Sequence, residues 1–362
     1  MEATTVTKTI KPRRQKRSGT IRLLESGLWQ SIARPRGQPV QSKTFFNKED
    51  GERWLRDIYN AVDKGAFVST VRAERMTFDD LADDFEKDFA PHHYRGAAWK
   101  SKLKSLRKRL GSYSLVAIVP QAVAGYRDQR LRDPDPRYKK NVGKAPRISP
   151  ATVKSELDLL AKILDVAQKE FGIPLPAGNP VSSIRLPRPG KGRERRLVGD
   201  EWQRLERECR ASGNRWLWLA VQLAVETAMR QGELLQLLWK HVDKKARVAL
   251  LVDKDKIKNA TPRAVPLSSR SLAVLEAMPR STTGRVIPLD RMTLYKAFQR
   301  ACARAGIADF RWHDLRHESL SRLAERGDLS IRELAEVSGH KTLQMLMRYT
   351  HIQASRLAAK IG

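Results

Sequence analysis

The C-terminal part of the chain holds a group of side chains that can act on an anion. Four of the seven histidines lie there, with an arginine and a tyrosine: His313, Arg316, His317, His340, Tyr349 and His351. His313 and Arg316 are three residues apart, so on a helix their side chains share one face. An imidazole beside a guanidinium suits a phosphate or a carboxylate, because arginine presents a planar fork of N–H donors.

A metal site is a second interpretation of His313 and His317, which are four residues apart as in the zinc-protease helix. That motif has a glutamate directly after the first histidine, whereas Asp314 stands here, and the intervening Arg316 repels a cation. We therefore expect neither a metal nor a cofactor. We interpret His317 as a buried, hydrogen-bonded core histidine.

Three further residues have ordinary explanations when each is taken singly. Tyr349, nine residues after His340, suits a packing residue with a polar tip. Arg230 follows an apolar helical stretch and suits a partner of the helix C-terminus or of Glu233. Lys258 lies in a turn between two predicted strands, where lysine is common for solubility.

The elements that must position these residues are mostly helical, so we predict an α+β, mostly α chain. Residues 1–20 form a flexible basic arm, and residues 21–72 a small β-rich module whose strands precede a helix at 48–63 capped by Asn47. Residues 75–173 are helical, with a long helix that Ser149 caps and Pro150 begins. A Pro-, Gly- and Arg-rich linker covers 174–196.

Residues 197–362 are predicted to form a mixed, mainly helical domain with a small antiparallel sheet. An apolar helix is expected near 216–229, and strands near 247–252 and 264–267. Helices are expected near 313–326, 330–337 and 342–349, and Ser330 with Glu333 forms a capping box. Arg230 then ends the apolar helix, and Tyr349 lies on the last helix.

A predicted helix over 99–110 has one apolar face, and its other face carries basic residues with no acid among them. A charged face is usually only solvated, but solubility does not require a single sign. We predict that this helix and the linker contact a polyanion through Lys100, Lys102, Lys104, Arg107, Lys108, Arg188, Lys191 and Arg193.

The composition supports a polyanion partner. The 362 residues carry a formal charge of +30 and give a pI of about 10.5, which is typical of nucleic-acid binding. A hydrophobic content of 41% excludes a disordered basic tail, and two cysteines exclude a disulfide framework. No apolar run approaches the ~18 residues of a membrane span, and no secretory signal is present. We expect a cytoplasmic, nucleoid-associated protein of bacterial or phage origin, without a membrane partner.

Taken together, four segments resemble the tyrosine recombinase (phage-type integrase) family. They are TAMRQGELL at 227–235, IKNATPRAVPLS at 257–268, WHDLRHES at 312–319 and SGHKTLQMLMRYTH at 338–351. The resemblance is strong over about 195–362, the catalytic domain. It is weaker over 75–172, which looks like a core-site binding domain, and weakest over 20–70, which looks like an arm-type binding domain. Ala228 departs from a usual glycine and Glu318 from a usual small residue, and both departures concern local packing.

The resemblance implies a site-specific recombinase that cleaves and rejoins DNA without a metal or ATP. Tyr349 would attack the scissile phosphate and form a 3′-phosphotyrosyl link. Arg230 and Arg316 would clamp its oxygens, and Lys258 would protonate the departing 5′-oxygen. His313 and His340 would bind the phosphate or assist proton transfer.

The arm-like module favours integration and excision of a phage or genomic island. A shufflon-type invertase or a resolvase of the same family is the alternative, because shufflon-type recombinases share a TAMRQGE-like segment. A type IB topoisomerase and a non-enzymatic DNA-binding protein are less favoured. The resemblance implies double-stranded DNA with core and arm sites as the partner. It also implies a homotetramer on paired sites, in which residues 351–362 dock on a neighbouring protomer. A host DNA-bending factor or an excisionase is the implied accessory protein.

Overall fold

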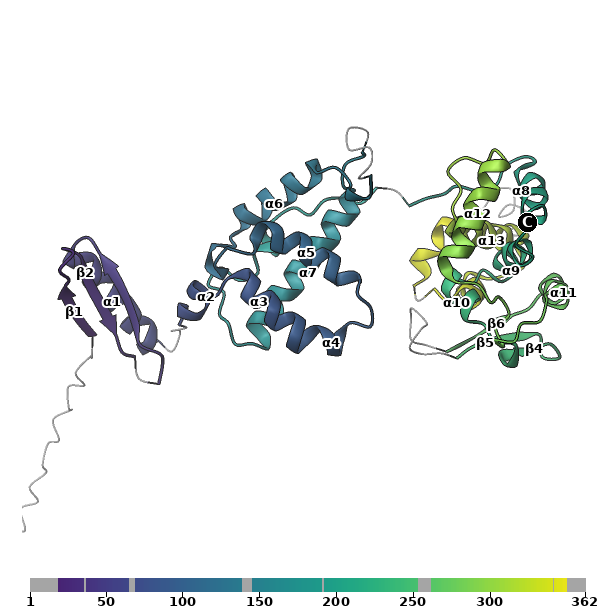
Figure 1. Ribbon diagram of the computed structural model, residues 1–362. Coiled ribbons are helices and arrows are strands. Elements are labelled where there is room, and N and C mark those ends of the chain that lie inside the picture. Colours follow the sequence, from purple (N-terminus) through teal and green to yellow (C-terminus); the bar gives the residue numbers. More distant parts are fainter. Residues whose placement is uncertain are drawn as a thin grey trace, which may run out of the picture. The chain divides into compact units, whose positions relative to one another are not determined.

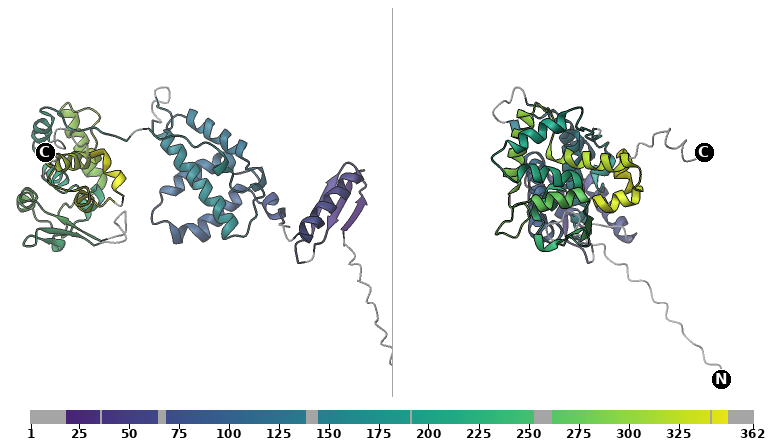
Figure 2. Two further views of the ribbon diagram at one scale, coloured as in Figure 1. Left: turned by 180° about the vertical axis from the view of Figure 1, so that it is seen from behind. Right: turned by 90° about the vertical axis from the view of Figure 1, so that its right-hand side faces the viewer.

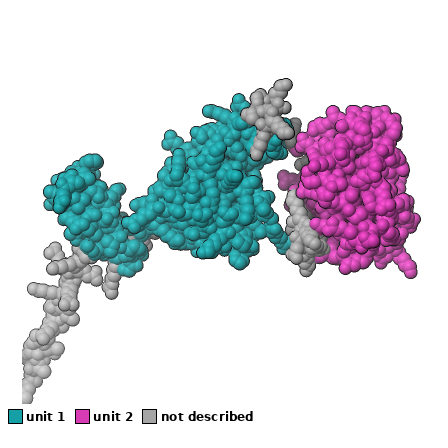
Figure 3. All heavy atoms as spheres, in the orientation of Figure 1, with its two compact units in different colours: residues 1–190 teal, residues 191–362 magenta. Residues whose placement is uncertain are grey.

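The structure is a computed structural model that describes residues 19–35, 37–64, 69–138, 145–190, 192–252, 262–340 and 342–349. The chain divides into two compact units, residues 1–190 and 191–362 (Figure 3). Three predicted features lie outside the described residues: the arm up to residue 18, the C-terminal segment from residue 350, and the two lysines Lys191 and Lys258.

Unit 1 begins with a three-stranded antiparallel sheet, ordered β1 (Gly19–Leu23), β2 (Trp29–Ala33) and β3 (Gln41–Phe45). Helix α1 (Lys48–Asp63) packs on one face of this sheet (Figures 1 and 2). The Asn47 side chain accepts a hydrogen bond from the backbone N–H of Asp50 at 3.1 Å. The predicted strands, helix and cap are confirmed.

The remainder of unit 1 is helical, with a core that includes Phe78, Phe85, Leu157 and Leu160. Ser149 caps α7 and Pro150 begins it, as predicted. The helices are α2 (Val71–Arg75), α3 (Phe78–Asp84), a π-helical turn (Phe85–Phe89), α4 (Ala90–His93), α5 (Ala98–Leu110), α6 (Pro120–Arg132), α7 (Pro150–Lys169) and 3₁₀ turns at Leu115–Ala117, Pro136–Tyr138 and Pro180–Ser183.

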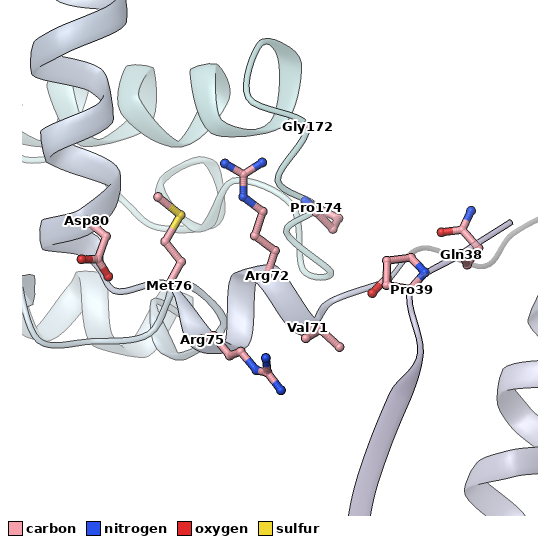
Figure 4. A pocket seen from close by; sticks show the side chains of 10 residues that line it. Gln38, Pro39, Val71, Arg72, Arg75, Met76, Asp80, Gly172 and Pro174 are labelled. Atoms are coloured by element: carbon pink, nitrogen blue, oxygen red, sulfur yellow. The ribbon is translucent and has the colours of Figure 1, made fainter. Parts of the chain in front are cut away.

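A pocket in unit 1 is lined by residues around α2 and the Gly172 turn, among them Arg72, Arg75, Met76 and Pro174. The Arg72 guanidinium extends toward the Gly172 turn, whereas Arg75 points away from it (Figure 4), and Arg72 donates a hydrogen bond to the carbonyl of Phe171. None of the residues predicted to act on an anion lines this pocket.

Unit 2 contains seven α-helices among its described residues and an antiparallel sheet ordered β4-β5-β6. The sheet has three strands where two were predicted, because the two-residue β4 is too short to leave a sequence pattern. The elements are α8 (Glu201–Arg210), α9 (Leu217–Thr227), α10 (Gln231–Gln236), β4 (Val242–Asp243), β5 (Val248–Leu251), β6 (Arg263–Pro266), α11 (Ser269–Ala277), α12 (Arg291–Arg304), α13 (Trp312–Arg326), α14 (Ile331–Ser338) and 3₁₀ turns at Trp239–His241, Leu343–Met345 and Met347–Tyr349.

The predicted fold class, α+β and mostly α, is confirmed, but two predicted elements differ. The apolar helix α9 ends at Thr227, because Ala228 adopts a left-handed conformation with φ of 52°. Arg230 therefore lies at the N-cap of α10 and does not end α9. The helix predicted over 342–349 is instead two short 3₁₀ turns. Among the described residues, no helix combines the length and apolarity that crossing a bilayer requires.

Candidate active site

Arg316, on α13, connects the ends of two other helices of unit 2. The residue lies in the first half of α13 and is only 3% exposed. Nη1 donates to the carbonyl of Ala228 after α9, and Nη2 donates to the carbonyl of Ser338 at the end of α14 at 2.6 Å. The same Nη2 lies 3.4 Å from Nε2 of His340. The structure thus brings together two residues that are far apart in the predicted motifs.

The backbone break at Ala228 aims its carbonyl at Arg316. A left-handed conformation favours glycine, because a Cβ is poorly tolerated there. The Ala228 side chain is nevertheless fully buried, in a small cluster with Leu320, Leu334 and Leu346. Alanine at 228, in place of the usual glycine, therefore accepts a strained backbone conformation and adds a buried methyl group. The departure affects local packing, as predicted.

Arg230 is held by a carboxylate that it shares with a second arginine. Nη1 of Arg230 lies 2.9 Å from one oxygen of Glu233, and Nη2 of Arg263 lies 2.9 Å from the other. Arg230 also donates to the carbonyl of Gly339 at 3.2 Å, and Arg263 donates to that of Val337. Sequence reasoning treated Glu233 only as a neutralising partner and missed Arg263, although Arg263 lies within the quoted 257–268 segment.

The site is strongly positive. Burial and then the charge of Arg230 lower the pKa of Arg316 to about 9, so the guanidinium remains charged at neutral pH. Burial raises the pKa of Glu233, but Arg263 and the backbone N–H of Arg230 outweigh it and hold that pKa below its usual range. Three arginines thus gather around one carboxylate, which pairs directly with Arg230 and Arg263. A bound anion relieves the resulting excess of positive charge.

His340 is a neutral hydrogen-bonding group in this environment. Burial and then the charges of Arg316 and Arg230 lower its pKa to about 4. The Ser338 hydroxyl donates to the Leu334 carbonyl at 2.6 Å and lies 2.7 Å from Nδ1 of His340. The Ser338 hydroxyl has one proton, which it donates to Leu334, so it accepts a hydrogen bond from Nδ1–H of His340. The Nε2 lone pair then faces Arg316.

Tyr349 meets α13 through His317. The Tyr349 hydroxyl forms a short hydrogen bond with Nδ1 of His317, and the two ring centroids are 5.8 Å apart. His317 is half-buried, and the ring of the exposed His313 stands edge-on to it at 5.0 Å. His317 is hydrogen-bonded as predicted, but it is only half-buried, so the predicted core position is wrong. Its i, i+4 spacing from His313 was the one signal that placed it on the same face.

Lys258, the predicted proton donor, lies outside the described residues. The strand that follows it, β6, is described and carries Arg263 into the site.

The last three arginines of the linker before α8 are engaged by carboxylates of unit 2. Arg193 donates to Asp309 and Asp314, and Arg195 to Glu201. Arg196 pairs with Glu318, which is 3% exposed and also accepts from Arg322 of the same helix. The glutamate that departs from a usual small residue therefore anchors the start of this unit.

The basic face of α5 is divided in the same way. Lys100, Lys104 and Lys108 are exposed at successive helical turns. Lys102 instead donates to the Ser155 hydroxyl of α7, and Arg107 lies within salt-bridge distance of three acids from the segment before α5: Asp79, Asp83 and Glu86. The sequence of α5 contains no acidic residue, but the fold brings acidic residues of the preceding segment against it.

Gly339 is a position where the site needs the absence of a side chain. Its φ is +66°, and an added Cβ would lie 2.7 Å from Nε and 2.9 Å from Cδ of Arg263. Gly284 has a similar φ of +71°, with nothing within 4 Å of an added Cβ.

Gly339→Ala is therefore expected to lower the free energy of unfolding more than Gly284→Ala. Backbone strain costs about 1–2 kcal/mol in each variant, and overpacking against Arg263 adds about 1–3 kcal/mol only at 339. Chemical denaturation of the full chain, followed by tryptophan fluorescence, measures both. Equal losses would contradict the close packing of Arg263 on Gly339.

Comparison with known proteins gives a consistent pattern. Residues 195–356 match the phage integrase family. A shufflon-specific DNA recombinase of Escherichia coli is 41% identical over 292 residues, which cover 80% of this chain and 73% of that protein. The integrase of Salmonella phage P22 is 28% identical, over 88% of this chain and 84% of that protein. A crystal structure of a lambda integrase tetramer bound to a Holliday junction has a similar fold, with a TM-score of 0.57 and 21% identity over 89% of this chain and 95% of that chain.

Proposed function

Since the chain belongs to the phage integrase family of tyrosine recombinases and is a site-specific recombinase that cleaves and rejoins DNA, we propose that the site on α13 performs this chemistry. Tyr349 attacks the scissile phosphate, and Arg230 and Arg316 bind its non-bridging oxygens. The charge that develops on these oxygens in the transition state is then stabilised by groups already in place.

The reaction exchanges one phosphodiester for another. The bond from phosphorus to the Tyr349 hydroxyl oxygen forms, and the bond from phosphorus to the DNA 5′-oxygen breaks. Lys258 protonates the departing 5′-oxygen, and His313 donates a hydrogen bond to the phosphate. The neutral His340 assists from beside the phosphate, where its Nε2 lone pair holds the Arg316 guanidinium. Because the phosphotyrosyl link conserves the bond energy, the 5′-hydroxyl of a second strand can reverse the step without ATP.

The observation that carries this proposal is the convergence on Arg316. One guanidinium connects the end of α9, the end of α14 and His340, and Arg230 reaches the adjacent Gly339 carbonyl. The resulting excess of positive charge is suited to one phosphate. The Tyr349 hydroxyl is hydrogen-bonded to His317, the residue that follows Arg316 on α13.

The proposal predicts a covalent protein–DNA adduct that forms without metal. Nicked duplexes tiled across the DNA that flanks the gene would be incubated with the protein in EDTA, so that cleavage releases a short 5′-hydroxyl strand and traps the enzyme. We expect an SDS-resistant adduct on a subset of the duplexes, because the arginines supply the charge that a metal would supply. Adduct formation that requires Mg²⁺ would contradict the arginine clamp.

We further propose that exposed cations of unit 1 and the linker contact the DNA backbone. Lys100, Lys104, Lys108 and Arg188 are exposed. Lys100 also lies 3.8 Å from a carboxylate oxygen of Glu86, an ion pair that contact with a DNA phosphate would replace. Lys102, Arg107 and Arg193 already have protein partners, and they contribute to DNA binding chiefly by positioning these elements. Each neutralised phosphate adds about −0.9 to the slope of log K against log salt.

The biological outcome we propose is integration and excision of a phage or genomic island. The β1–β3 module with α1 supports this proposal as an arm-type binding domain (residues 21–72), beside a core-site domain over 75–173. Inversion is a second candidate, because the shufflon-specific recombinase is 41% identical whereas the phage P22 integrase is 28% identical. The proposed assembly is a homotetramer on paired sites, with a host DNA-bending factor or an excisionase as accessory.

A plasmid assay separates the two outcomes. Two copies of the site that forms the adduct are placed either on separate plasmids or inverted on one plasmid, with and without residues 1–70. Integration predicts joint plasmids that disappear when residues 1–70 are deleted. Inversion that is equally efficient with and without residues 1–70, with no joint plasmids, would favour the second candidate.

A further inference from the structure

We propose that His317 is the general base that takes the proton of the Tyr349 hydroxyl during DNA cleavage and returns it during rejoining. This inference rests on the proposed function and adds a residue that the predicted set did not contain. The ordinary pKa of tyrosine is about 10, so a tyrosine nucleophile needs a proton acceptor at neutral pH.

The geometry places an acceptor directly on the nucleophile. Nδ1 of His317 and the Tyr349 hydroxyl are hydrogen-bonded, and the rings pack at an interplanar angle of 31°. Tyr349 ends the 3₁₀ turn Met347–Tyr349, whose neighbouring Leu346 is fully buried. A buried anchor next to the nucleophile thus holds the hydroxyl against α13.

The other two described histidines of the site are less suited to this step. Nδ1 of His340 is used by Ser338, and its Nε2 faces the Arg316 guanidinium. The ring of His313 is exposed and stands edge-on to His317, so His313 orients that ring from the preceding helical turn. His317 is the histidine whose ring nitrogen contacts the attacking oxygen.

Positively charged groups surround His317. Arg316 precedes it on α13, Tyr349 faces it from the 3₁₀ turn, and His340 interacts with it electrostatically from the turn after α14. Arg230 and Arg263 bring further positive charge toward the same turn. A phosphate bound in this site offsets that positive charge and so stabilises the imidazolium that forms during attack.

The proton and electron balance is complete. As the tyrosine oxygen forms its bond to phosphorus, its proton moves to Nδ1 of His317, while the departing 5′-oxygen receives a separate proton from Lys258. In rejoining, the 5′-hydroxyl attacks phosphorus and gives its proton back to the neutral Lys258. The bond between phosphorus and the tyrosine oxygen breaks, and the imidazolium returns its proton to Tyr349.

The test is the single-turnover rate of adduct formation by the full chain on a trapping duplex, measured from pH 5.5 to 9.5. His317→Asn keeps a hydrogen-bond acceptor near the position of Nδ1 but cannot accept a proton, and His317→Ala removes both. His241→Asn, in a 3₁₀ turn of the same unit, is the matched control. DNA affinity and thermal unfolding are measured for each variant.

We expect both His317 variants to lose about 10²–10⁴-fold in rate at pH 7, with DNA affinity and His241→Asn unchanged. The wild-type rate should level off as pH rises, whereas the His317→Asn rate should continue to rise as tyrosine ionises directly. A fluorinated tyrosine of lower pKa at position 349 should restore part of the loss in His317→Asn, a rescue that a merely structural role does not predict.

The outcomes separate this inference from the proposed function. If wild type forms an adduct and His317→Asn keeps the wild-type rate and pH profile, His317 only positions Tyr349 and the general-base assignment is overturned. If wild type forms no adduct on any tiled duplex, the proposed function fails and the inference fails with it. Loss in His317→Asn without rescue by the fluorinated tyrosine would also overturn the assignment.

Discussion

Tyr349→Phe is expected to form no SDS-resistant adduct on a duplex that traps the wild-type protein, while its DNA affinity stays within about 2-fold. The substitution removes only the hydroxyl oxygen, and with it the nucleophile. The ring still packs against the cluster of Ala228, Leu320, Leu334 and Leu346, so the fold around the site is retained. The loss should exceed about 10⁴-fold, because phenylalanine offers no oxygen to the phosphate.

Tyr295→Phe is the matched control, since Tyr295 lies on α12 of the same unit and is 38% exposed. Gel shift and denaturing gels on the same radiolabelled duplex measure affinity and adduct in parallel. An undiminished adduct in Tyr349→Phe would assign the nucleophile to another residue.

Arg316→Ala is expected to slow adduct formation by about 10³–10⁵-fold, the range known for arginines that stabilise phosphoryl-transfer transition states. Arg316→Lys should recover only a small part of this loss. A lysine keeps the charge but cannot donate to the Ala228 and Ser338 carbonyls and also form a planar fork on the phosphate.

Arg322→Lys provides the comparison on the same helix, because Arg322 pairs with Glu318 and is 38% exposed in its side chain. It should keep the rate within about 2-fold. Single-turnover rates at saturating protein separate the chemical step from binding. If Arg316→Lys cleaves at the wild-type rate, a point charge suffices and the bidentate clamp is not required.

The order and spacing of HxxR, GH and tyrosine led from the sequence to a candidate catalytic set, because each motif is short and its register is local. The structure places two members of that set, Arg316 and His340, next to each other. The proposed role of His317 was not predictable, since it depends on where the 343–349 segment places the Tyr349 hydroxyl. That segment also lacks the predicted helix. Its two 3₁₀ turns meet at the buried Leu346, between Met345 and Met347, which are 54% and 60% exposed.

The basic residues show a second limit of sequence reasoning. A run of like charges predicts a polyanion site only if no acid approaches it in the fold. Arg193 meets Asp314, 121 residues later, and Arg107 of α5 meets Asp83 of α3. Periodicity along α5 correctly predicted its buried face, because that face depends on local geometry. It could not reveal tertiary ion pairs, which depend on how separate elements pack.

The fold itself was largely predictable because its helices carry local signals. Asn47, Ser149 and Ser330 accept hydrogen bonds from the N-terminal backbone of their helices, as their sequence positions predicted. The end of α9 was not predictable to the residue, because a left-handed alanine at 228 is uncommon and leaves no sequence signal. The left-handed conformation of Ala228 ends α9 and so places Arg230 at the N-cap of α10, where it contributes to the site.

The central claim is that Tyr349 carries the DNA during the reaction, and peptide mapping of the trapped adduct tests it most directly. The adduct is digested with a protease and a nuclease, and the peptide that bears the residual nucleotide is sequenced by mass spectrometry. We predict a single modified peptide with the 3′-phosphate on Tyr349. A nucleotide on any other residue, or on none, would contradict the account.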